Sequence, residues 1–233
     1  MSDQKIKTVA VLGAGAMGNG IAHVFARSGF DVILRDVDAH ALERALATIG
    51  ANLDREVKKG KITESEKPAI LARLKRVTDI APLANVDFAV EAVPEQFELK
   101  ARVLKEVDGV LPPHAILASN TSSISITELA SQTSCPDRFV GMHFMNPVPV
   151  MVLVEVVRGR ATSESTFQAT MALCEKLGKK PVCVNDAPGF VANRVLMPMI
   201  NEAASAVMEG VATPEAIDAV MKLGMNHPMG PLE

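Results

Sequence analysis

The sequence predicts an α/β protein, with a mainly parallel, doubly wound sheet followed by an all-helical region. Three observations predict this class. Short apolar segments of strand length alternate with segments of helical periodicity over the first 186 residues. A glycine-rich turn at 13–18 joins the first strand to the first helix. Beyond a linker at 185–189 the pattern is wholly helical. We therefore expect two domains, residues 1–186 and residues 187–233.

The first domain is expected to alternate strands with helices. Strands are predicted at 7–12, 31–36, 88–93, 115–120, 138–145, 150–157 and 181–184. Helices are predicted from the glycine turn to about Gly29, near 98–110, and near 163–177. This alternation is typical of a parallel sheet with helices on both faces.

A helical hairpin is expected between the second and third of these strands. The segment from Ala39 to Arg76 has a helical pattern, with a break at Gly60 and a restart at Thr63–Glu66, which matches a capping box. Its two halves would form an antiparallel helical hairpin inserted between strands.

The second domain is expected to begin with a long apolar helix from about Phe190 to Met208, ended by Gly210. A further helix is predicted to start at Thr213, with Thr213 as its N-cap and Pro214 at its first helical position.

Composition excludes several classes of protein. With 233 residues, 48% of them hydrophobic, the chain can bury a full core. A net charge of -3 and the absence of Trp and Tyr argue against nucleic acid as a partner. No apolar stretch is long enough to span a bilayer, and Met1–Lys5 leads into a strand without a signal sequence. Three cysteines without CxxC spacing predict neither a disulfide framework nor a metal site. We expect a soluble cytoplasmic protein.

The glycine turn predicts a Rossmann-like dinucleotide site. Its GxGxxG pattern follows a strand, opens a helix and precedes a second strand that ends in Asp36. Gly13 would permit the tight turn, Gly15 the approach of the pyrophosphate, and Gly18 close helix–strand packing. A carboxylate at Asp36 would bind the adenosine ribose and repel a 2′-phosphate, which favours NAD. The alternative is a turn that only packs the helix. The candidate NAD-binding residues here are Gly13, Gly15, Ala16, Met17, Gly18 and Asp36.

A lone glutamate, Glu155, indicates a second site. It lies in the apolar run 150–157, twelve residues after His143 in another strand-like segment. If the two segments pair antiparallel about Pro149, His143 and Glu155 face each other. An imidazole oriented by a buried carboxylate is a general base, as the oxidation of an alcohol requires. The alternative is a core histidine in a structural ion pair.

With these motifs, the chain resembles the L-3-hydroxyacyl-CoA dehydrogenase family, and within it the bacterial members that act on 3-hydroxybutyryl-CoA. The resemblance covers essentially the whole chain and is carried by residues 13–22, 118–123, 141–147, 154–156, 188–194 and 224–231. It implies reversible NAD-dependent oxidation of an L-3-hydroxyacyl-CoA to the 3-ketoacyl-CoA, and the resemblance alone favours a short acyl chain. It also implies that His143 is the base and that Glu155 orients it.

The resemblance assigns further roles. Ser122 matches a serine that hydrogen-bonds the reacting hydroxyl and the nicotinamide region, and Asn193 an asparagine that contacts substrate. Either residue could equally be a helix cap. Glu95, Lys100 and Asn146 match positions that contact NAD, although Lys100 alone would be interpreted as an ordinary surface lysine.

The family binds acyl-CoA partly through the helical hairpin, which here carries many basic residues. Lys59 aligns with a CoA-contacting lysine, and Asn52 stands where the family has a serine. A solvated helix face is the alternative for these charges.

The family pattern continues past Glu233 with helices that supply most of a dimer interface and part of the active-site wall. We therefore expect residues 187–233 to be the truncated start of that domain, and a homodimer where those helices are present. Two other functions are compatible with the motifs. One is a related NAD-dependent dehydrogenase of a free hydroxy acid or sugar acid, and the other is a non-catalytic NAD-binding protein.

Overall fold

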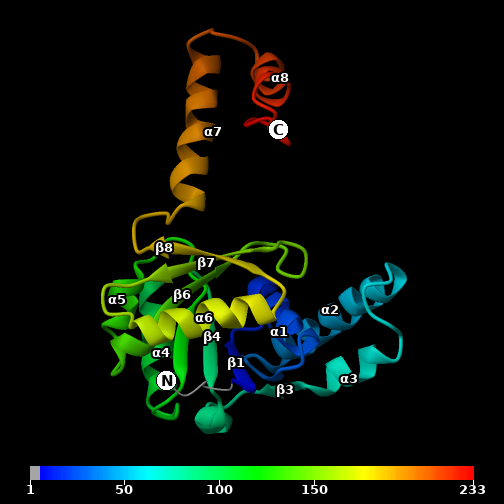
Figure 1. Ribbon diagram of the computed structural model, residues 1–233, viewed down its shortest axis with the longest axis vertical. Helices are drawn as coiled ribbons and strands as arrows, with labels where there is room; N and C mark the ends of the chain where they lie inside the picture. The colour runs from blue at the N-terminus through cyan, green and yellow to red at the C-terminus, as the bar shows by residue number, and fades with distance from the viewer. Residues whose placement is uncertain (1–5) are drawn as a thin grey trace. The chain divides into compact units, whose positions relative to one another are not determined.

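The computed structural model describes residues 6–233 and contains one eight-stranded sheet with helices on both faces (Figure 1). The strands are β1 (Thr8–Leu12), β2 (Asp31–Arg35), β3 (Leu74–Val77), β4 (Phe88–Glu91), β5 (Ile116–Ser119), β6 (Phe139–Phe144), β7 (Leu153–Arg158) and β8 (Lys180–Asn185). The helices are α1 (Ala16–Arg27), α2 (Ala39–Lys58), α3 (Glu66–Ala72), α4 (Phe97–Asp108), α5 (Ile126–Ala130), α6 (Glu164–Lys176), α7 (Ala192–Met208) and α8 (Pro214–Gly224). Short 3₁₀ helices occupy Ala81–Asn85 and Pro136–Arg138.

The strand order is β3-β2-β1-β4-β5-β6-β7-β8, and every neighbouring pair is parallel except β6 with β7. The prediction of a mainly parallel, doubly wound sheet is therefore confirmed. The order reverses between β1 and β4, which is the place where such sheets bind ligands.

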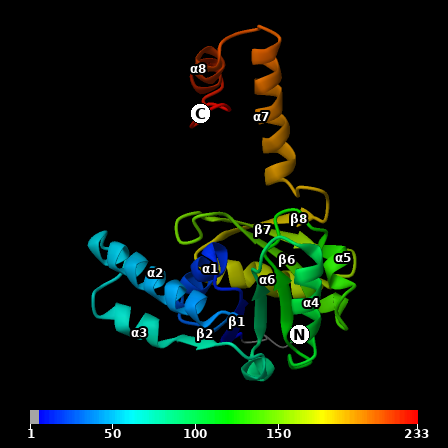
Figure 2. The same ribbon diagram turned by 180° about the vertical axis from the view of Figure 1, so that it is seen from behind.

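The core lies on both faces of this sheet. Side chains alternate along each strand, so Val9 and Val11 of β1 pack with α1, α2 and α6 in one apolar cluster. Buried residues of α4 and α5 belong to the opposite face. Figures 1 and 2 show α6 and α4 on opposite sides of the sheet.

The end of the predicted helical hairpin is wrong. Residues Leu74–Val77 form β3, an edge strand parallel to β2, and α3 ends at Ala72. Lys75 and Arg76 are exposed and suit a helix, but backbone pairing with β2 decides the conformation, because tertiary contacts override local propensity. The capping box forms in part: the Glu66 carboxylate accepts a hydrogen bond from the Thr63 N–H at 2.6 Å.

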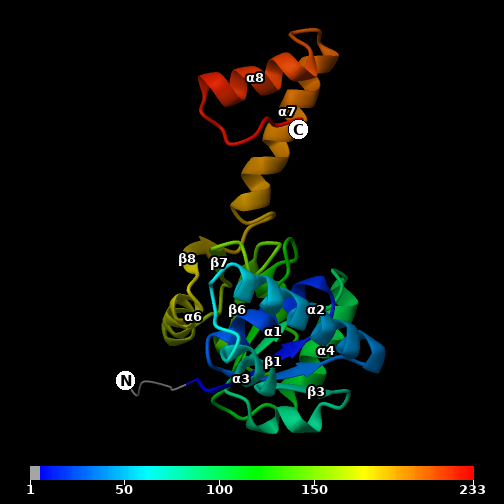
Figure 3. The ribbon, with the colours of Figure 1, turned by 90° about the vertical axis from the view of Figure 1, so that its right-hand side faces the viewer.

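The chain divides into two compact units, one ending at Ala187 and one comprising Pro188–Glu233. Within the second unit, α7 and α8 pack against each other (Figure 3). Helix α8 begins as predicted, with Pro214 first and the Thr213 side chain accepting a hydrogen bond from Ala216 N–H. Among the helices of the described residues, none is long and apolar enough to cross a membrane.

Candidate functional site

Five of the predicted site residues of the first unit lie where parallel strands end. Gly13 follows β1, Asp36 follows β2, Glu95 lies in the segment after β4, Ser122 in the segment after β5, and Asn146 in the segment after β6. Because these strands run in one direction, their carboxyl ends share one edge of the sheet. The topology thus brings five separate sequence segments to one edge.

Packing explains two of the three glycines of the turn. Gly13 has φ +101°, and a Cβ there would lie 2.7 Å from the carbonyl oxygen of Ala92 after β4. A Cβ on Gly18 would lie 1.8 Å from the carbonyl oxygen of Gly13. Only glycine at position 18 therefore allows α1 to start this close to the turn. Around Gly15 the space is open, because apart from its chain neighbours no described heavy atom lies within 4 Å of where a Cβ would be.

The start of α1 fits a phosphate group. Gly15 is its N-cap without a side-chain hydrogen bond, and the first turn of α1 contains no acidic residue. Gly15 and Ala16 are exposed, and Met17 is half-buried. The N–H groups of such a helix start and its positive dipole end attract anions. The residues present therefore fit a dinucleotide, with the pyrophosphate next to Gly15.

Asp36 is tied to this turn. Its carboxylate accepts hydrogen bonds from the N–H of Ala14 at 2.7 Å and from the N–H of Asp38 at 3.0 Å. The carboxylate is thus held beside the glycine turn, where the sequence predicted the adenosine ribose.

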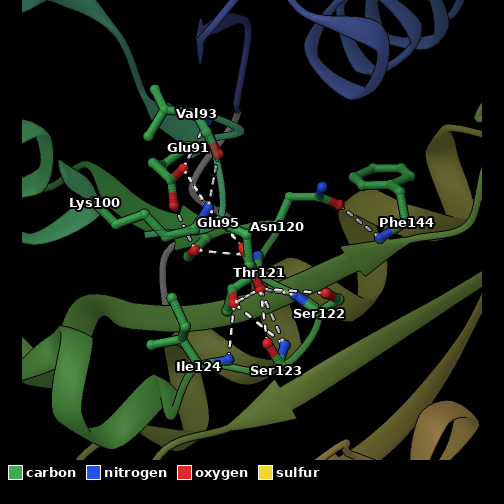
Figure 4. A network of polar contacts seen from close by, with 11 residues as sticks. Glu91, Val93, Glu95, Lys100, Asn120, Thr121, Ser122, Ser123, Ile124 and Phe144 are labelled. Carbon is green, nitrogen blue, oxygen red and sulfur yellow. Dashed lines mark hydrogen bonds and ion pairs between the residues drawn. The ribbon is translucent and has the colours of Figure 1, made fainter. Parts of the chain in front are cut away.

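Strands β6 and β7 place His143 directly opposite Glu155, which confirms the predicted antiparallel pairing. The Nδ1 atom of His143 lies 2.7 Å from Oε2 of Glu155, and the two residues are 8% and 2% exposed. The side-chain oxygen of Asn120 accepts a hydrogen bond from the Phe144 N–H at 2.9 Å, which fastens the end of β6 to the end of β5 (Figure 4). The imidazole is therefore held by its strand and by a buried carboxylate.

Glu95 organises the turn that carries Ser122. Its Oε1 atom accepts hydrogen bonds from the Thr121 hydroxyl at 2.5 Å, from the Ser122 N–H at 2.8 Å and from the Ser123 N–H at 3.2 Å (Figure 4). Burial alone would raise the pKa of Glu95, but the hydrogen bond from Thr121 and the positive charge of Lys100 lower this pKa to about 2. Glu95 is thus a carboxylate throughout the physiological range.

The interpretation of Lys100 as a surface lysine is wrong. Lys100 is 1% exposed, and its Nζ lies 2.8 Å from Oε1 of Glu91, 3.0 Å from the Val93 carbonyl oxygen and 3.2 Å from Oε2 of Glu95. The helical spacing of α4 buries it together with Val103 and Val107. Lys100 therefore belongs to the interior of the site.

The remaining predicted residues lie on other elements. Asn52 lies on α2, where its side-chain oxygen accepts a hydrogen bond from Arg55 Nη1 at 2.7 Å, and the exposed Lys59 is the C-cap of α2. Asn193 is the second residue of α7 and belongs to the second unit. Asn146 is exposed and precedes a cis peptide bond to Pro147.

Sequence reasoning missed Glu91. It is 0% exposed and lies at the end of the apolar strand β4. A single carboxylate in an apolar strand is the same signal that identified Glu155, and it was present in the sequence. Among residues 6–233, no group of three or more His, Cys, Asp or Glu side chains is arranged to hold a metal ion.

Comparisons with known proteins agree with this geometry. Residues 8–187 match the family model "3-hydroxyacyl-CoA dehydrogenase, NAD binding domain", and residues 189–233 match "3-hydroxyacyl-CoA dehydrogenase, C-terminal domain". The chain is 54% identical over 228 residues to the probable 3-hydroxybutyryl-CoA dehydrogenase of Bacillus subtilis, covering 98% of this chain and 79% of the relative. It is 53% identical over 228 residues to the 3-hydroxybutyryl-CoA dehydrogenase of Bradyrhizobium diazoefficiens, covering 98% and 78%.

A solved structure is similar as well. The crystal structure of (S)-3-hydroxybutyryl-CoA dehydrogenase from Ralstonia eutropha superposes with a TM-score of 0.95 at 52% sequence identity. The match covers 97% of this chain and 80% of that one. Similarity therefore extends over both units of the chain.

Proposed function

The chain belongs to the 3-hydroxyacyl-CoA dehydrogenase family, and from this premise we propose that it catalyses the reversible, NAD-dependent oxidation of an L-3-hydroxyacyl-CoA to the 3-ketoacyl-CoA. The observation that carries the proposal is the buried contact of 2.7 Å between His143 Nδ1 and Glu155 Oε2, beside the edge of the sheet where a dinucleotide fits. The relatives named above are 3-hydroxybutyryl-CoA dehydrogenases, which supports a short acyl chain.

His143 is the general base of the proposed reaction. With Nδ1–H donated to Glu155, the proton of the substrate hydroxyl is taken by the other ring nitrogen, Nε2. Glu155 fixes the orientation of the ring and stabilises the imidazolium that forms. Bound NAD supplies the acceptor for the hydride. A base positioned in this way contributes about 10² to 10⁴ in rate.

Ser122 and Asn193 complete the proposed set. The Ser122 hydroxyl is proposed to hydrogen-bond the reacting oxygen and the nicotinamide region, and Asn193 to contact the substrate. Support for Ser122 comes from its turn at the end of β5, which Glu95 holds through two backbone N–H groups.

The cofactor is proposed to occupy the edge from Gly13 to Asn146. Its pyrophosphate lies at Gly15–Gly18, its adenosine ribose at Asp36, and its nicotinamide half near Glu95 and Lys100. The carboxylate of Asp36, already beside the glycine turn, favours NAD over a cofactor with a 2′-phosphate. The phosphates of CoA are proposed to bind near Asn52 and Lys59 of the helical hairpin, where exposed basic residues gather.

A homodimer through the second unit, formed where the further C-terminal helices of the family are present, and a cytoplasmic location are also proposed. The dimer is supported by the large apolar side chains that this unit exposes, which are Val191, Val195, Leu196, Met197, Met208, Val211, Val220, Leu223, Met225 and Met229. An exposed apolar surface of this kind marks a protein contact.

The test replaces His143 with Gln, which keeps a polar side chain but removes the base. NADH oxidation in the presence of acetoacetyl-CoA, followed by absorbance, should fall by about 10² to 10⁴ while NADH still binds. The matched control, His114→Gln, changes an exposed histidine and should turn over like the wild type. Near-normal turnover by His143→Gln would contradict the proposal. Faster turnover of free acetoacetate than of acetoacetyl-CoA would favour the free-acid dehydrogenase instead.

A further inference from the structure

Polar contacts beneath the Ser122 turn form a closed ring. Glu91 contacts Lys100, Lys100 contacts Glu95, and Glu95 holds the turn at Thr121 and Ser122 (Figure 4). The ring closes through Ser119, whose hydroxyl donates to Oε2 of Glu91 at 2.6 Å and accepts from the Thr121 N–H at 3.2 Å. The turn is thus fastened from both of its ends.

Most of the side chains in the ring are buried, which restricts them to the partners that they have within the protein. Glu91, Lys100 and Ser119 are 0–1% exposed, so water cannot replace the contacts that Glu91 makes with Lys100 and Ser119. Both carboxylate oxygens of Glu91 are used, because Oε1 accepts from the Val93 N–H at 2.7 Å and from Lys100, and Oε2 from Ser119. The Lys100 ammonium has three protons and three oxygen neighbours. Breaking any one of these contacts leaves a buried polar group without its partner.

Glu95 connects this interior to the proposed site. Its two carboxylate oxygens have different partners: Oε2 contacts Lys100, and Oε1 accepts hydrogen bonds from the turn. Its side chain is 37% exposed, so solvent alone would let it rotate. Lys100 and the donors of the turn together therefore fix the direction in which Glu95 points, and Glu91 helps the Val93 carbonyl oxygen to hold Lys100 in place.

We propose that Glu91 is a positioning residue, which acts through Lys100 and Glu95 to fix the turn that presents Ser122. Glu91 touches neither substrate nor cofactor in this proposal. Lys100 likewise contributes to the site through Glu95, because its three protons already have acceptors. The inference rests on the proposed function in so far as Ser122 serves the reaction.

The test replaces Glu91 with Gln, which keeps the shape of the side chain and removes its charge. Hydrogen–deuterium exchange of a peptide covering residues 119–124 should become about tenfold faster or more. The kcat for acetoacetyl-CoA reduction should fall by about tenfold to 100-fold, because a misplacement near 1 Å costs on the order of 100-fold in rate. The NADH dissociation constant should rise by less than the kcat falls, because the pyrophosphate site at Gly15 is not part of the ring and only the nicotinamide half lies near Glu95 and Lys100. It can be measured by NADH fluorescence, since the chain has no Trp.

The matched control is Glu56→Gln. Glu56 is also buried and also pairs with a cation, Arg27 at 2.7 Å, but it joins α1 to α2 and has no contact with the ring. This variant should lose thermal stability without faster exchange at 119–124 and without a lower kcat. Ser119→Ala is a milder second variant, since it removes one hydroxyl, and should change exchange and kcat in the same direction as Glu91→Gln.

Two results would overturn the proposal: unchanged exchange at 119–124 in both Glu91→Gln and Ser119→Ala, or faster exchange with the kcat of the wild type. An equal response in Glu56→Gln would overturn it as well, because the effect would then be general destabilisation. If the wild type itself fails to oxidise NADH with acetoacetyl-CoA, the proposed function fails. The exchange data then still decide whether Glu91 holds the turn.

Discussion

At Glu95, one carboxylate oxygen accepts hydrogen bonds from three consecutive residues, Thr121, Ser122 and Ser123. These donors favour the charged form, which is why the pKa of Glu95 falls from 4.5 to about 2 despite burial. An unfolded chain has no such turn, so the unfolded state binds this proton at higher pH than the folded state. The contacts of Glu95 therefore stabilise the fold above pH 4.5.

This gives a pH prediction for Glu95→Gln. The stabilisation by Glu95 is fully present above pH 4.5 and is lost as pH falls to about 2. Because more than a third of the side chain is exposed, we expect only about 1 kcal/mol at pH 7. Urea unfolding should show the wild type more stable than Glu95→Gln at pH 7, with the difference shrinking between pH 4.5 and pH 2. A difference that stays constant over this window would contradict the assignment.

A side-chain contact of the site could be predicted from the sequence where a charged residue lay alone in an apolar segment. The pairing of His143 with Glu155 followed from equal spacing about Pro149, and the register confirms it. Glu91 was missed because its partner, Lys100, lies in a helix nine residues later, and no strand register predicts that contact. Whether a lysine is buried depends on which helix face meets the sheet, and this is decided by the tertiary structure.

On the scale of elements, the glycine turn shows what each position requires. Gly18 is needed because its backbone lies against the Gly13 carbonyl, which is a packing requirement. Gly15 has open space around it, so the protein itself has no need for glycine there. We propose that the pyrophosphate of the cofactor is what requires glycine at this position.

We accordingly predict that Gly15→Ala separates binding from folding. The added methyl meets no protein atom among the described residues, so the melting temperature should be unchanged, but it projects where the pyrophosphate approaches α1. Loss of one charge-assisted hydrogen bond, worth about 1.5 kcal/mol or more, should raise the NADH dissociation constant about tenfold. Gly50→Ala is the control, since Gly50 also has open space but lies within α2. Equal NADH affinity in the two variants would exclude Gly15 from the cofactor site.

Helices with a regular spacing of apolar residues could be predicted from the sequence, whereas elements fixed by tertiary contacts could not. Helices α1, α4 and α6 follow apolar spacing, and their expected ranges agree with the structure within a few residues. Strand β3 could not be predicted, because its four residues form a strand only beside β2. Helix α5 was also missed. Its start is fixed by a distant residue, Asp186, whose carboxylate accepts hydrogen bonds from the N–H groups of Ile126 and Thr127.

On the scale of the whole molecule, the second unit differs from the first in how little it buries. In the segment Pro188–Glu233 the buried residues are Phe190, Ala203, Asp218 and Gly230. Two helices that bury so few residues and expose many of their apolar side chains are not stabilised by their own packing alone. Their stability therefore depends on a surface supplied by something else, and a second copy is the occupant we propose.

Light scattering tests this inference at micromolar concentration. We expect a dimer for the wild type and a shift toward monomer for Leu223→Lys, because burying a leucine contributes about 1.5–3 kcal/mol. That loss should raise the dimer dissociation constant by about tenfold or more. Glu209→Lys introduces the same lysine at a polar position of the same unit and should leave the dimer intact. A monomeric wild type would refute a homodimer formed through residues 188–233 alone.

The ladder between β6 and β7 has an evolutionary consequence. Its register runs from Gly141 opposite Val157 to Phe144 opposite Val154, so the ladder sets His143 opposite Glu155. The connecting residues 145–152 lie outside it. Insertions or deletions in that connection can reshape the rim of the site while the pair stays in place, whereas a slip of one residue in the ladder would turn His143 to the other face. Lineages descending from this fold can therefore change the length of the loop and inherit the same pair, provided that Asn146 and the buried Val148 keep their places.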